Sequence, residues 1–257
     1  MCISIITRAY KTSELKNLIN YLNLDSNEEK EIIAVCNIND YEIKNAKIII
    51  ENSNRFKAKI TGIKNSNYDN VLLLDSDQIP EKGLLNELIN KKNDMVIIPE
   101  KSIYNNFTSR CLDDWRLRNE TYAMKQPTPY IPVIPRFYKR KYLMNAINNM
   151  LPENFDVIMN HEDSVLYYEV FKQTKNIGFS NKYILNYDPN FLNLIRKAFL
   201  YGQNENKIKL TKLPLDIKEL IDKLNNNSSN IRELGFGKGY ILQIIRAIAY
   251  EFGKTIG

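Results

Sequence analysis

Two carboxylates one residue apart, Asp75 and Asp77, directly follow the apolar run Val71–Leu74. Carboxylates at the end of a buried strand can hold Mg²⁺ or Mn²⁺, with phosphate oxygens and water as the remaining ligands. Such an ion would neutralise charge on a departing nucleoside diphosphate. An acidic pair after a strand is also a common turn and helix-capping signal, so the motif by itself leaves both interpretations open.

A second acidic pair, Glu162 and Asp163, begins a predicted helix that runs to Gln173. The exposed N–H groups of a first helical turn favour acidic residues by about 0.3–1 kcal/mol each, and this alone explains such a pair. Sugar transfer with inversion, however, needs a carboxylate that deprotonates the acceptor hydroxyl opposite the leaving group. The combination with Asp75 and Asp77 therefore makes Asp163 the candidate base.

The elements that position these residues alternate, because short β-branched runs are separated by helical stretches, as is typical of parallel βαβ units. We predict strands at Cys2–Thr7, Glu31–Cys36, Ala46–Glu51, Val71–Leu74 and Met95–Pro99, and helices after Ser13 and at Phe56–Ile63 and Leu84–Ile89. These elements form a Rossmann-like half that ends near residue 100. Since open α/β sheets bind ligands at the carboxyl ends of their strands, Asp75 and Asp77 are predicted to lie at the ligand-binding edge.

The second half of the chain shows less periodicity. Lys101–Ile134, with several tyrosines and prolines, is predicted to be a long irregular segment that forms a lid or a wall of the acceptor site. The elements predicted after it are regular structure at Phe137–Ile147, helices at Asn160–Gln173, Phe191–Phe199 and Tyr240–Phe252, and a loop or linker at Asn225–Asn230. We divide the chain into residues 1–205, with a nucleotide-binding half (1–100) and an acceptor half (101–205), and a basic C-terminal helical extension, 206–257.

The composition indicates one main domain, because 257 residues of which 44% are hydrophobic can bury one sizeable core. Cys2, Cys36 and Cys111 are far apart and contain no CxxC pair, which argues against a disulfide framework and a zinc site. We expect reduced, buried thiols. The sequence contains no GxGxxG, GxxxxGK[ST] or GxSxG motif, which disfavours dinucleotide-binding, P-loop and serine-hydrolase functions.

The net charge of +6 is unevenly distributed: residues 189–257 hold 11 Lys or Arg and 6 Asp or Glu, a balance of +5, and residues 1–188 contribute +1. This balance fits an anionic membrane surface or a phosphate-bearing acceptor, and without a nucleic-acid-binding motif we expect no nucleic-acid partner. No stretch is long and apolar enough to span a membrane, and the apolar run directly after Met1 leaves no room for a secretory signal. We expect a cytoplasmic protein, peripheral at the inner face of the membrane if its C-terminal helix binds lipid.

With these motifs the chain resembles the family 2 glycosyltransferases, inverting enzymes with a GT-A fold, over residues 2–205. The family's nucleotide-contacting turn after the first strand is matched by Ile5–Tyr10, its DxD motif by Asp75-Ser76-Asp77, and its acidic pair by Glu162-Asp163. The segment Leu194–Gly202, LIRKAFLYG, is similar to a stretch in members that work at membranes.

The resemblance implies an α/β fold of the GT-A type, with a Rossmann-like, mixed and mainly parallel sheet flanked by helices and followed by a C-terminal helical extension. It implies Mn²⁺ or Mg²⁺ as cofactor, held by Asp77 with Asp75, and catalysis by Asp163 as base with Glu162 near the acceptor. The residues it implies in nucleotide-sugar binding are Thr7, Arg8, Ala9, Tyr10, Asn37, Lys59, Asp75 and Ser76.

Two stretches depart from the family's pattern. Cys36–Asp40 replaces an acidic pair that contacts the base, so the sequence leaves both a UDP-linked and a GDP-linked donor open. Asn186–Pro189 replaces a stretch whose histidine can complete the metal shell, which leaves Asn186, Asp188 or water for that position.

The sequence therefore predicts a metal-dependent, inverting glycosyltransferase, a hexosyltransferase by resemblance, that moves a sugar from a nucleoside diphosphate sugar to a hydroxyl of a glycan or lipid-linked acceptor. A nucleotidyltransferase-like enzyme is one alternative, although such enzymes normally carry a glycine-rich loop after the first strand and Thr7–Ser13 contains no glycine. A non-catalytic GT-A-like binding module is the other alternative, which the presence of Asp77 and Asp163 disfavours.

The C-terminal helix has two interpretations. It carries an apolar stripe of Tyr240, Ile241, Ile244, Ile245, Ile248 and Phe252, and a polar face with Lys238, Gln243, Arg246 and Lys254. Either the helix docks on the domain through its Ile stripe, or it lies in a membrane interface with Lys238, Arg246 and Lys254 facing phosphates.

Overall fold

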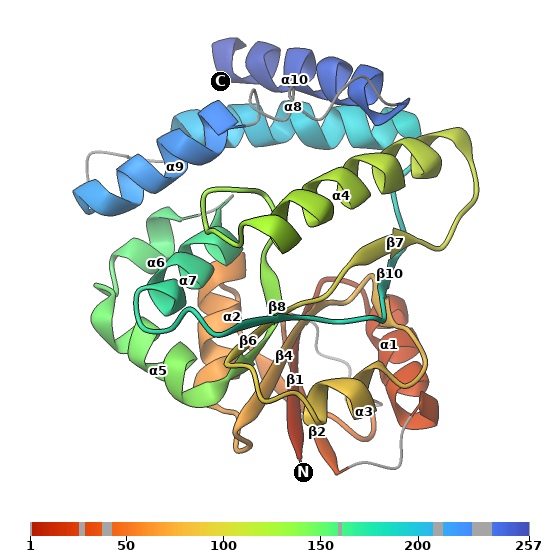
Figure 1. Cartoon of the computed structure of the whole chain (residues 1–257), viewed down its shortest axis with the longest axis vertical. Coiled ribbons are helices and arrows are strands. Elements are labelled where there is room, and N and C mark those ends of the chain that lie inside the picture. The colour runs from red at the N-terminus through yellow and green to blue at the C-terminus, as the bar shows by residue number, and fades with distance from the viewer. Residues whose placement is uncertain are drawn as a thin grey trace.

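The predicted alternation of strands and helices is confirmed in the computed structural model, which describes residues 2–25, 29–37, 43–158, 161–207, 213–227 and 238–256. These residues form a seven-stranded sheet in the order β3-β2-β1-β4-β8-β6-β9 (Figure 1). Its strands are β1 Ile3–Ala9, β2 Lys30–Cys36, β3 Lys47–Ile50, β4 Asn70–Asp75, β6 Met95–Ile97, β8 Pro135–Lys139 and β9 Ile177–Phe179. β3, β2, β1 and β4 are parallel, and β8 runs antiparallel to both β4 and β6. The sheet is mixed and mainly parallel, as predicted.

The central strand β4 shows why these apolar runs form the sheet. Its residues Val71 and Leu73 pack into one core cluster, and Leu72 and Leu74 pack into another. A parallel strand that is buried on both faces needs a continuous apolar run rather than an alternating one. The helices that cover the first face are α2 Arg55–Lys64, α5 Arg140–Asn149, α6 Asn154–Val157 and α7 Glu162–Phe171, and those that cover the second are α1 Thr12–Asp25 and α3 Leu84–Ile89.

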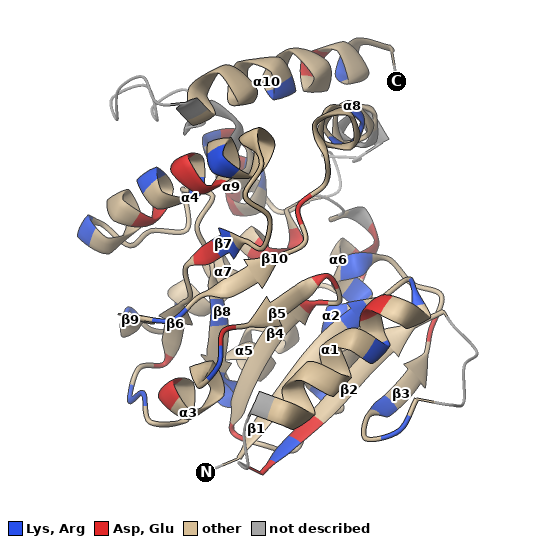
Figure 2. Ribbon diagram, turned by 90° about the vertical axis from the view of Figure 1, so that its right-hand side faces the viewer, with Lys and Arg blue, Asp and Glu red and all other residues tan. Residues whose placement is uncertain are grey.

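A second, three-stranded sheet lies beyond the carboxyl end of β4 (Figure 2). Its strands are β5 Gln78–Pro80, β7 Glu100–Ser102 and β10 Ile184–Asn186. β10 pairs antiparallel with β5 and parallel with β7, which places Asn186 opposite both Gln78 and Ser102. This small sheet therefore brings segments 108 residues apart in the chain to one side of the turn after β4.

The structure corrects the prediction that Lys101–Ile134 is irregular throughout. Phe107–Lys125 forms the 19-residue helix α4, which Asn106 caps by accepting a hydrogen bond from the backbone N–H of Ser109. The buried face of α4 includes the polar residues Thr108, Ser109, Asn119 and Glu120. Because these residues interrupt the apolar stripe, hydrophobic periodicity does not reveal the helix. Within Lys101–Ile134, residues 103–106 before α4 and 126–134 after it lack a helix or strand.

The C-terminal part of the described chain forms α8 Phe191–Lys207, α9 Leu215–Asn227 and α10 Lys238–Ile256, which lie with α4 at one end of the molecule (Figure 1). α10 packs against both α8 and α4. A Cβ at Gly202 would lie 2.0 Å from the carbonyl oxygen of Tyr250, and a Cβ at Gly253 would lie 2.1 Å from that of Phe199. The two glycines therefore allow the backbones of α8 and α10 to touch.

This crossing corrects the predicted orientation of the C-terminal helix. Leu242 is 2% exposed and faces the domain, whereas Ile241 and Ile248 are 65% exposed and Phe252 is 60% exposed. Docking through the Ile stripe is wrong because the close approach requires the glycine side of α10, which points away from that stripe. The orientation of Arg246 toward membrane phosphates is also wrong, since its Nε atom is buried.

Three predicted features reach beyond the described residues. Ile38–Asp40, in the stretch after β2, lies outside them, as do residues 228–237 before α10. The predicted loop at Asn225–Asn230 begins inside α9, which extends to Asn227. Within the described ranges, no helix is long and apolar enough to cross a membrane.

Candidate active site

A cavity of about 920 Å³ opens at the carboxyl ends of β1 and β4, between the main sheet, the small sheet and α8. Six residues predicted from the sequence line it: Arg8, Tyr10, Lys59, Asp75, Ser76 and Asp77. Other polar groups of its wall, such as Glu100 and Arg136, come from distant segments of the chain. The volume lies within the ~300–1,000 Å³ typical of ligand pockets.

Asp75 ends β4 and lies opposite Arg8 of β1 in the parallel register. Its backbone N–H donates a hydrogen bond of 3.0 Å to Oε1 of Gln78, which closes the turn after the strand. Burial would raise the pKa of Asp75, but the positive charges of Lys59 and Arg136 outweigh burial and lower it. The cavity therefore holds Asp75 as a carboxylate.

Asp77, two residues further along the chain, has a pKa that is shifted in the opposite direction from that of Asp75. Its pKa is raised, first by burial and second by the charge of Asp75, against a lowering by Lys197. Two nearby carboxylates are costly together unless a cation compensates them. Within the described residues no group of three or more His, Cys, Asp or Glu side chains could hold a metal ion, so the protein ligands considered for this site are Asp75 and Asp77. Such a donor set fits Mg²⁺ or Mn²⁺ bound mainly through phosphate oxygens and water.

The two side chains considered for a third metal position have other partners. Oδ1 of Asn186 accepts a hydrogen bond of 2.9 Å from Nε2 of Gln78. Asp188 accepts hydrogen bonds of 2.9 and 2.6 Å from the two Nη atoms of Arg116. Both residues therefore hold neighbouring segments together, which leaves water as the simplest third ligand.

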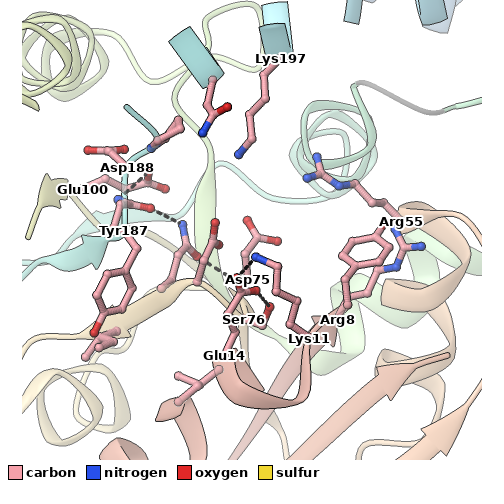
Figure 3. A pocket seen from close by; sticks show the side chains of 18 of the residues that line it. Arg8, Lys11, Glu14, Arg55, Asp75, Ser76, Glu100, Tyr187, Asp188 and Lys197 are labelled. Atoms are coloured by element: carbon pink, nitrogen blue, oxygen red, sulfur yellow. Dashed lines mark hydrogen bonds and ion pairs between the residues drawn. The ribbon is translucent and has the colours of Figure 1, made fainter. Parts of the chain in front are cut away.

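Cationic side chains line the cavity around Asp75: Figure 3 shows Lys197 pointing into the cavity from α8, and Arg8 and Arg55 lying together at another side. Nη2 of Arg8 donates a hydrogen bond of 2.6 Å to the carbonyl oxygen of Ser53, and its guanidinium lies 4.1 Å from the ring centroid of Tyr10. Burial lowers the pKa of Arg8. Guanidinium and ammonium groups bind phosphate oxygens, so the cavity suits a ligand that carries several of them.

The second acidic pair lies directly behind this cavity. Nζ of Lys59 donates a hydrogen bond to Oδ1 of Asp163, 104 residues away, and lies 3.6 Å from Oε1 of Glu162. Nη1 of Arg136 lies 3.5 Å from Oδ2 of Asp163. Among the described residues that line the cavity, Lys59 and Arg136 are present and the two acids are not. The candidate base is thus separated from the cavity by two cationic side chains.

Burial and charge act against each other in this buried cluster. Burial lowers the pKa of Lys59, but the charges of Asp163 and Glu162 outweigh burial and raise it. Burial also raises the pKa of Glu162, against the lowering effect of Lys59. Lys59 is therefore a permanent cation whose loss would leave two acids without their main partner.

Three residues with a predicted role in nucleotide binding lie outside the described cavity wall. Thr7 and Ala9 are each 1% exposed in β1. Since side chains alternate along a strand, both point to the face opposite that of Arg8. Asn37 is exposed after β2 and does not line the cavity either. Their role in nucleotide binding stays a prediction.

Several charged groups of the cavity wall were not predicted from the sequence, among them Arg55, Glu100, Arg136 and Lys197. Arg55 lies one residue before the predicted helix Phe56–Ile63; because α2 in fact begins at Arg55, this residue shares a helix face with Lys59, four residues later. Lys197 belongs to the segment Leu194–Gly202. The similarity of this segment to family members that work at membranes does not predict that it lines a cavity. No sequence pattern predicts that Glu100 and Arg136 line the cavity. Glu100 reaches it because β7 joins the small sheet, and Arg136 because β8 joins the main sheet.

Several solved structures of glycosyltransferases share this arrangement of elements. The chain matches the mannosyltransferase PcManGT from Pyrobaculum calidifontis, in complex with GDP-Man and Mn²⁺, with a TM-score of 0.57 and 14% identity, over 99% of this chain and 83% of that chain. It matches S. aureus TarS 1–349 in complex with UDP-GlcNAc with a TM-score of 0.51 and 14% identity, over 100% and 90% of the two chains. A longer S. aureus TarS chain matches with a TM-score of 0.54 and 15% identity over 99% of this chain, which spans 55% of that longer chain.

No protein-family model and no curated protein matches the sequence. The structural similarity nevertheless covers nearly the whole chain. The chain therefore has the GT-A fold, as the sequence predicts.

Proposed function

We propose that the protein is a metal-assisted, inverting glycosyltransferase that moves a sugar from a UDP- or GDP-linked donor to a hydroxyl of a glycan or lipid-linked acceptor. The observation that carries this proposal is one cavity in which Asp75 and Asp77 lie among Arg8, Arg55 and Lys197. Carboxylates for a divalent ion and cations for phosphate oxygens are the two complements that a nucleoside diphosphate needs. The same fold binds UDP-GlcNAc in TarS and GDP-Man with Mn²⁺ in PcManGT, which supports the proposal.

In this proposal, residues 1–100 bind the donor, 101–205 form the acceptor half, and 206–257 are the helical extension. Asp77 and Asp75 would hold Mn²⁺ or Mg²⁺, and the bound ion would neutralise charge on the leaving diphosphate. Arg8, Arg55 and Lys197 bind phosphate oxygens directly. Donor binding should therefore be strengthened by the metal and retained in part without it.

Asp163 is the proposed base, and Glu162 lies beside it. Oδ1 of Asp163 is hydrogen-bonded to Lys59, whereas Oδ2 is 3.5 Å from Arg136 and engaged less closely. We assign Oδ2 as the proton acceptor, because Oδ1 is already hydrogen-bonded to Lys59. An acceptor hydroxyl would have to approach this atom to about 2.6–3.2 Å.

A thermal-shift screen of UDP, GDP and their sugar conjugates, with and without Mn²⁺, tests donor binding, since a ligand that binds only the native state raises the melting temperature. We expect a nucleotide-dependent rise that Mn²⁺ enlarges, and we expect Asp77→Asn to remove only the Mn²⁺-dependent part. Asp222→Asn, an exposed position on α9, makes the same change in charge and should behave as wild type. No rise with any of these ligands would contradict the proposal, and a rise restricted to nucleoside triphosphates would favour nucleotidyl transfer.

The exposed stripe of α10 supports a second part of the proposal, a peripheral position on an anionic membrane at its inner face. Ile241 and Ile248 are 65% exposed and Phe252 is 60% exposed, along one side of the helix. Large apolar side chains gathered on one helix face mark a binding surface. The +5 balance of residues 189–257 favours anionic lipid as its partner.

Vesicle flotation tests this part. Phosphatidylcholine vesicles that contain phosphatidylglycerol should recover the protein, vesicles of phosphatidylcholine alone should not, and Ile248→Ser combined with Phe252→Ser should abolish recovery. Leu151→Ser removes a side chain that is 54% exposed in another part of the chain and serves as the control. Equal recovery with both vesicles would contradict the proposal, and a smaller apparent mass of the stripe variant in solution would assign the stripe to a second copy of the chain.

A further inference from the structure

A second cavity, of about 270 Å³, lies between α4, α8, α10 and the segment 132–134. It shares Glu100, Arg136 and Asp188 with the larger cavity, so these side chains form the wall between the two. Arg136 also contacts the proposed base, Asp163, at 3.5 Å. The second cavity therefore meets the first next to the proposed base.

Two of the three arginines in this cavity are neutralised by carboxylates. Nη2 of Arg116 lies 2.6 Å from Oδ1 of Asp188, and Nη2 of Arg136 lies 3.0 Å from Oε1 of Glu100. The third, Arg246 of α10, forms no ion pair with any carboxylate in the described ranges. Among the described residues, Arg246 is thus the one arginine of this cavity without a directly paired carboxylate, although the more distant charge of Asp188 favours its charged form.

Arg246 also has a buried N–H group without a hydrogen-bond acceptor among the described residues. Its Nη1 donates to Oε1 of Gln243 at 3.1 Å, but its Nε is buried and has no acceptor within the described part of the chain. Burial lowers its pKa. A buried guanidinium with an unused N–H is costly unless an anion accepts from it. The group is therefore poised to bind an oxyanion, and a planar guanidinium can do so through two parallel hydrogen bonds.

The opposite side of the cavity presents groups that suit a sugar. Glu120 is 8% exposed and accepts a hydrogen bond of 2.8 Å from the backbone N–H of Glu100. A carboxylate accepts several hydrogen bonds, so Glu120 has capacity for hydroxyl donors. The half-buried ring of Trp115 adds a flat apolar surface, and Asn119 donates Nδ2 to the carbonyl oxygen of Trp115 (2.7 Å), which leaves its own amide oxygen for another donor.

We propose that this cavity binds the acceptor, and that Arg246 binds a phosphate or carboxylate group carried by that acceptor, an inference that rests on the proposed glycosyl transfer. The hydroxyls of the same unit would donate to Glu120, and its ring would pack on Trp115. A volume of about 270 Å³ lies just below the ~300–1,000 Å³ of drug-sized pockets, so the cavity takes one small unit of the acceptor. Arg136 lines both cavities and lies 3.5 Å from Oδ2 of Asp163, so it would stand between that unit and the proposed base.

Calorimetric titration with sodium phosphate, and separately with sodium glucuronate, tests the oxyanion site in the full-length protein. Arg246→Gln should weaken binding of the preferred anion about tenfold or more, as expected for loss of a charge-assisted hydrogen bond in a buried site. Lys197→Gln, in the larger cavity, should keep this binding event and lose nucleotide affinity instead. Arg110→Gln removes an exposed arginine from α4 and should leave both unchanged.

The outcomes separate this inference from the proposed function. Equal anion affinity of Arg246→Gln and wild type would overturn the inference, whether or not nucleotides bind. Anion binding that depends on Arg246 in a protein that binds no nucleotide sugar would keep the oxyanion site and remove its role as an acceptor site. Stronger binding of phosphate or of glucuronate would identify the group that the acceptor carries.

The stability of Arg246→Met provides a second measurement. Methionine keeps an unbranched apolar stem and removes the buried charge, so its melting temperature in phosphate-free buffer should equal or exceed that of wild type. Phosphate should then raise the melting temperature of wild type more than that of Arg246→Met, in which only the cations of the larger cavity remain to bind it. A clear fall in the melting temperature of Arg246→Met without phosphate would show that Arg246 has a structural role, and would overturn the inference.

Discussion

Gly202→Ala tests the contact between α8 and α10, because helix propensity and packing predict changes of opposite sign. By propensity alone, alanine in place of glycine inside a helix stabilises by about 0.5–1 kcal/mol. In the structure, a Cβ at Gly202 would lie 2.0 Å from the carbonyl oxygen of Tyr250 and 2.9 Å from the backbone nitrogen of Lys254. Contacts of a Cβ below 3.0 Å are essentially never observed, so the helices would have to separate by about 3.0 minus 2.0, or 1 Å.

The size of the effect follows from these opposing terms. An extra methyl group forced into a packed contact costs about 1–3 kcal/mol, and the gain in propensity offsets only part of it. We expect a net loss of about 1–2 kcal/mol in the free energy of unfolding. At about 2–4 °C per kcal/mol for a domain of this size, the melting temperature should fall by about 2–8 °C.

Thermal unfolding followed by circular dichroism measures this change. Ala247→Gly, on the exposed face of α10, is the control, because it should lose about 1 kcal/mol through propensity alone. Gly202→Ala should also weaken nucleotide binding, since Lys197 lies on the same helix as Gly202. A rise in the melting temperature of Gly202→Ala would refute the packed crossing and the orientation of α10 derived from it.

Three further predictions concern the buried charges. Asp163→Asn should keep the nucleotide-dependent thermal shift and lose sugar transfer, and transfer at the wild-type rate would show that Asp163 is not the base. Lys59→Met should lower the free energy of unfolding in urea by about 3–5 kcal/mol, because it leaves Glu162 and Asp163 without their shared cation, and a loss below 1 kcal/mol would contradict this role. Burial raises the pKa of Glu120, so the contribution of Glu120 to stability is present below its unfolded pKa of 4.5 and is lost as the pH rises through the folded pKa. Glu120→Gln should therefore unfold at a higher temperature than wild type at pH 7, with a difference that shrinks toward pH 4, and a difference independent of pH would contradict the raised pKa.

The parallel half of the fold was predictable because its signals are local. Val71–Leu74 forms a continuous apolar run, which a strand covered on both faces requires, and the acidic residues that follow it must then lie at the carboxyl edge of the sheet. The pairing of Asp75 with the cations of the cavity was less predictable. Arg8 is fixed by its register opposite Asp75, but Lys197 reaches the cavity from a helix more than 100 residues later in the chain.

The helix α4 shows where local patterns fail. Its buried face carries Ser109, Asn119 and Glu120, and the buried carboxylate of Glu120 is bonded by a group from another segment. The backbone N–H of Glu100, for example, donates to Glu120 across 20 residues of sequence. Hydrophobic periodicity measures how apolar residues are spaced in the chain, and it contains no information about such partners.

The sequence by itself therefore determined the main alternation of strands and helices in the first 100 residues, the place of Asp75 and Asp77 at the end of β4, and the amphipathic character of the C-terminal helix. Only the tertiary structure decided which face of that helix is buried, and that Lys59 and Arg136 stand between Asp163 and the cavity. The physical reason is that side-chain periodicity is a property of each segment, whereas charge pairing and close helix contact depend on atoms that folding brings together from about 100 residues apart.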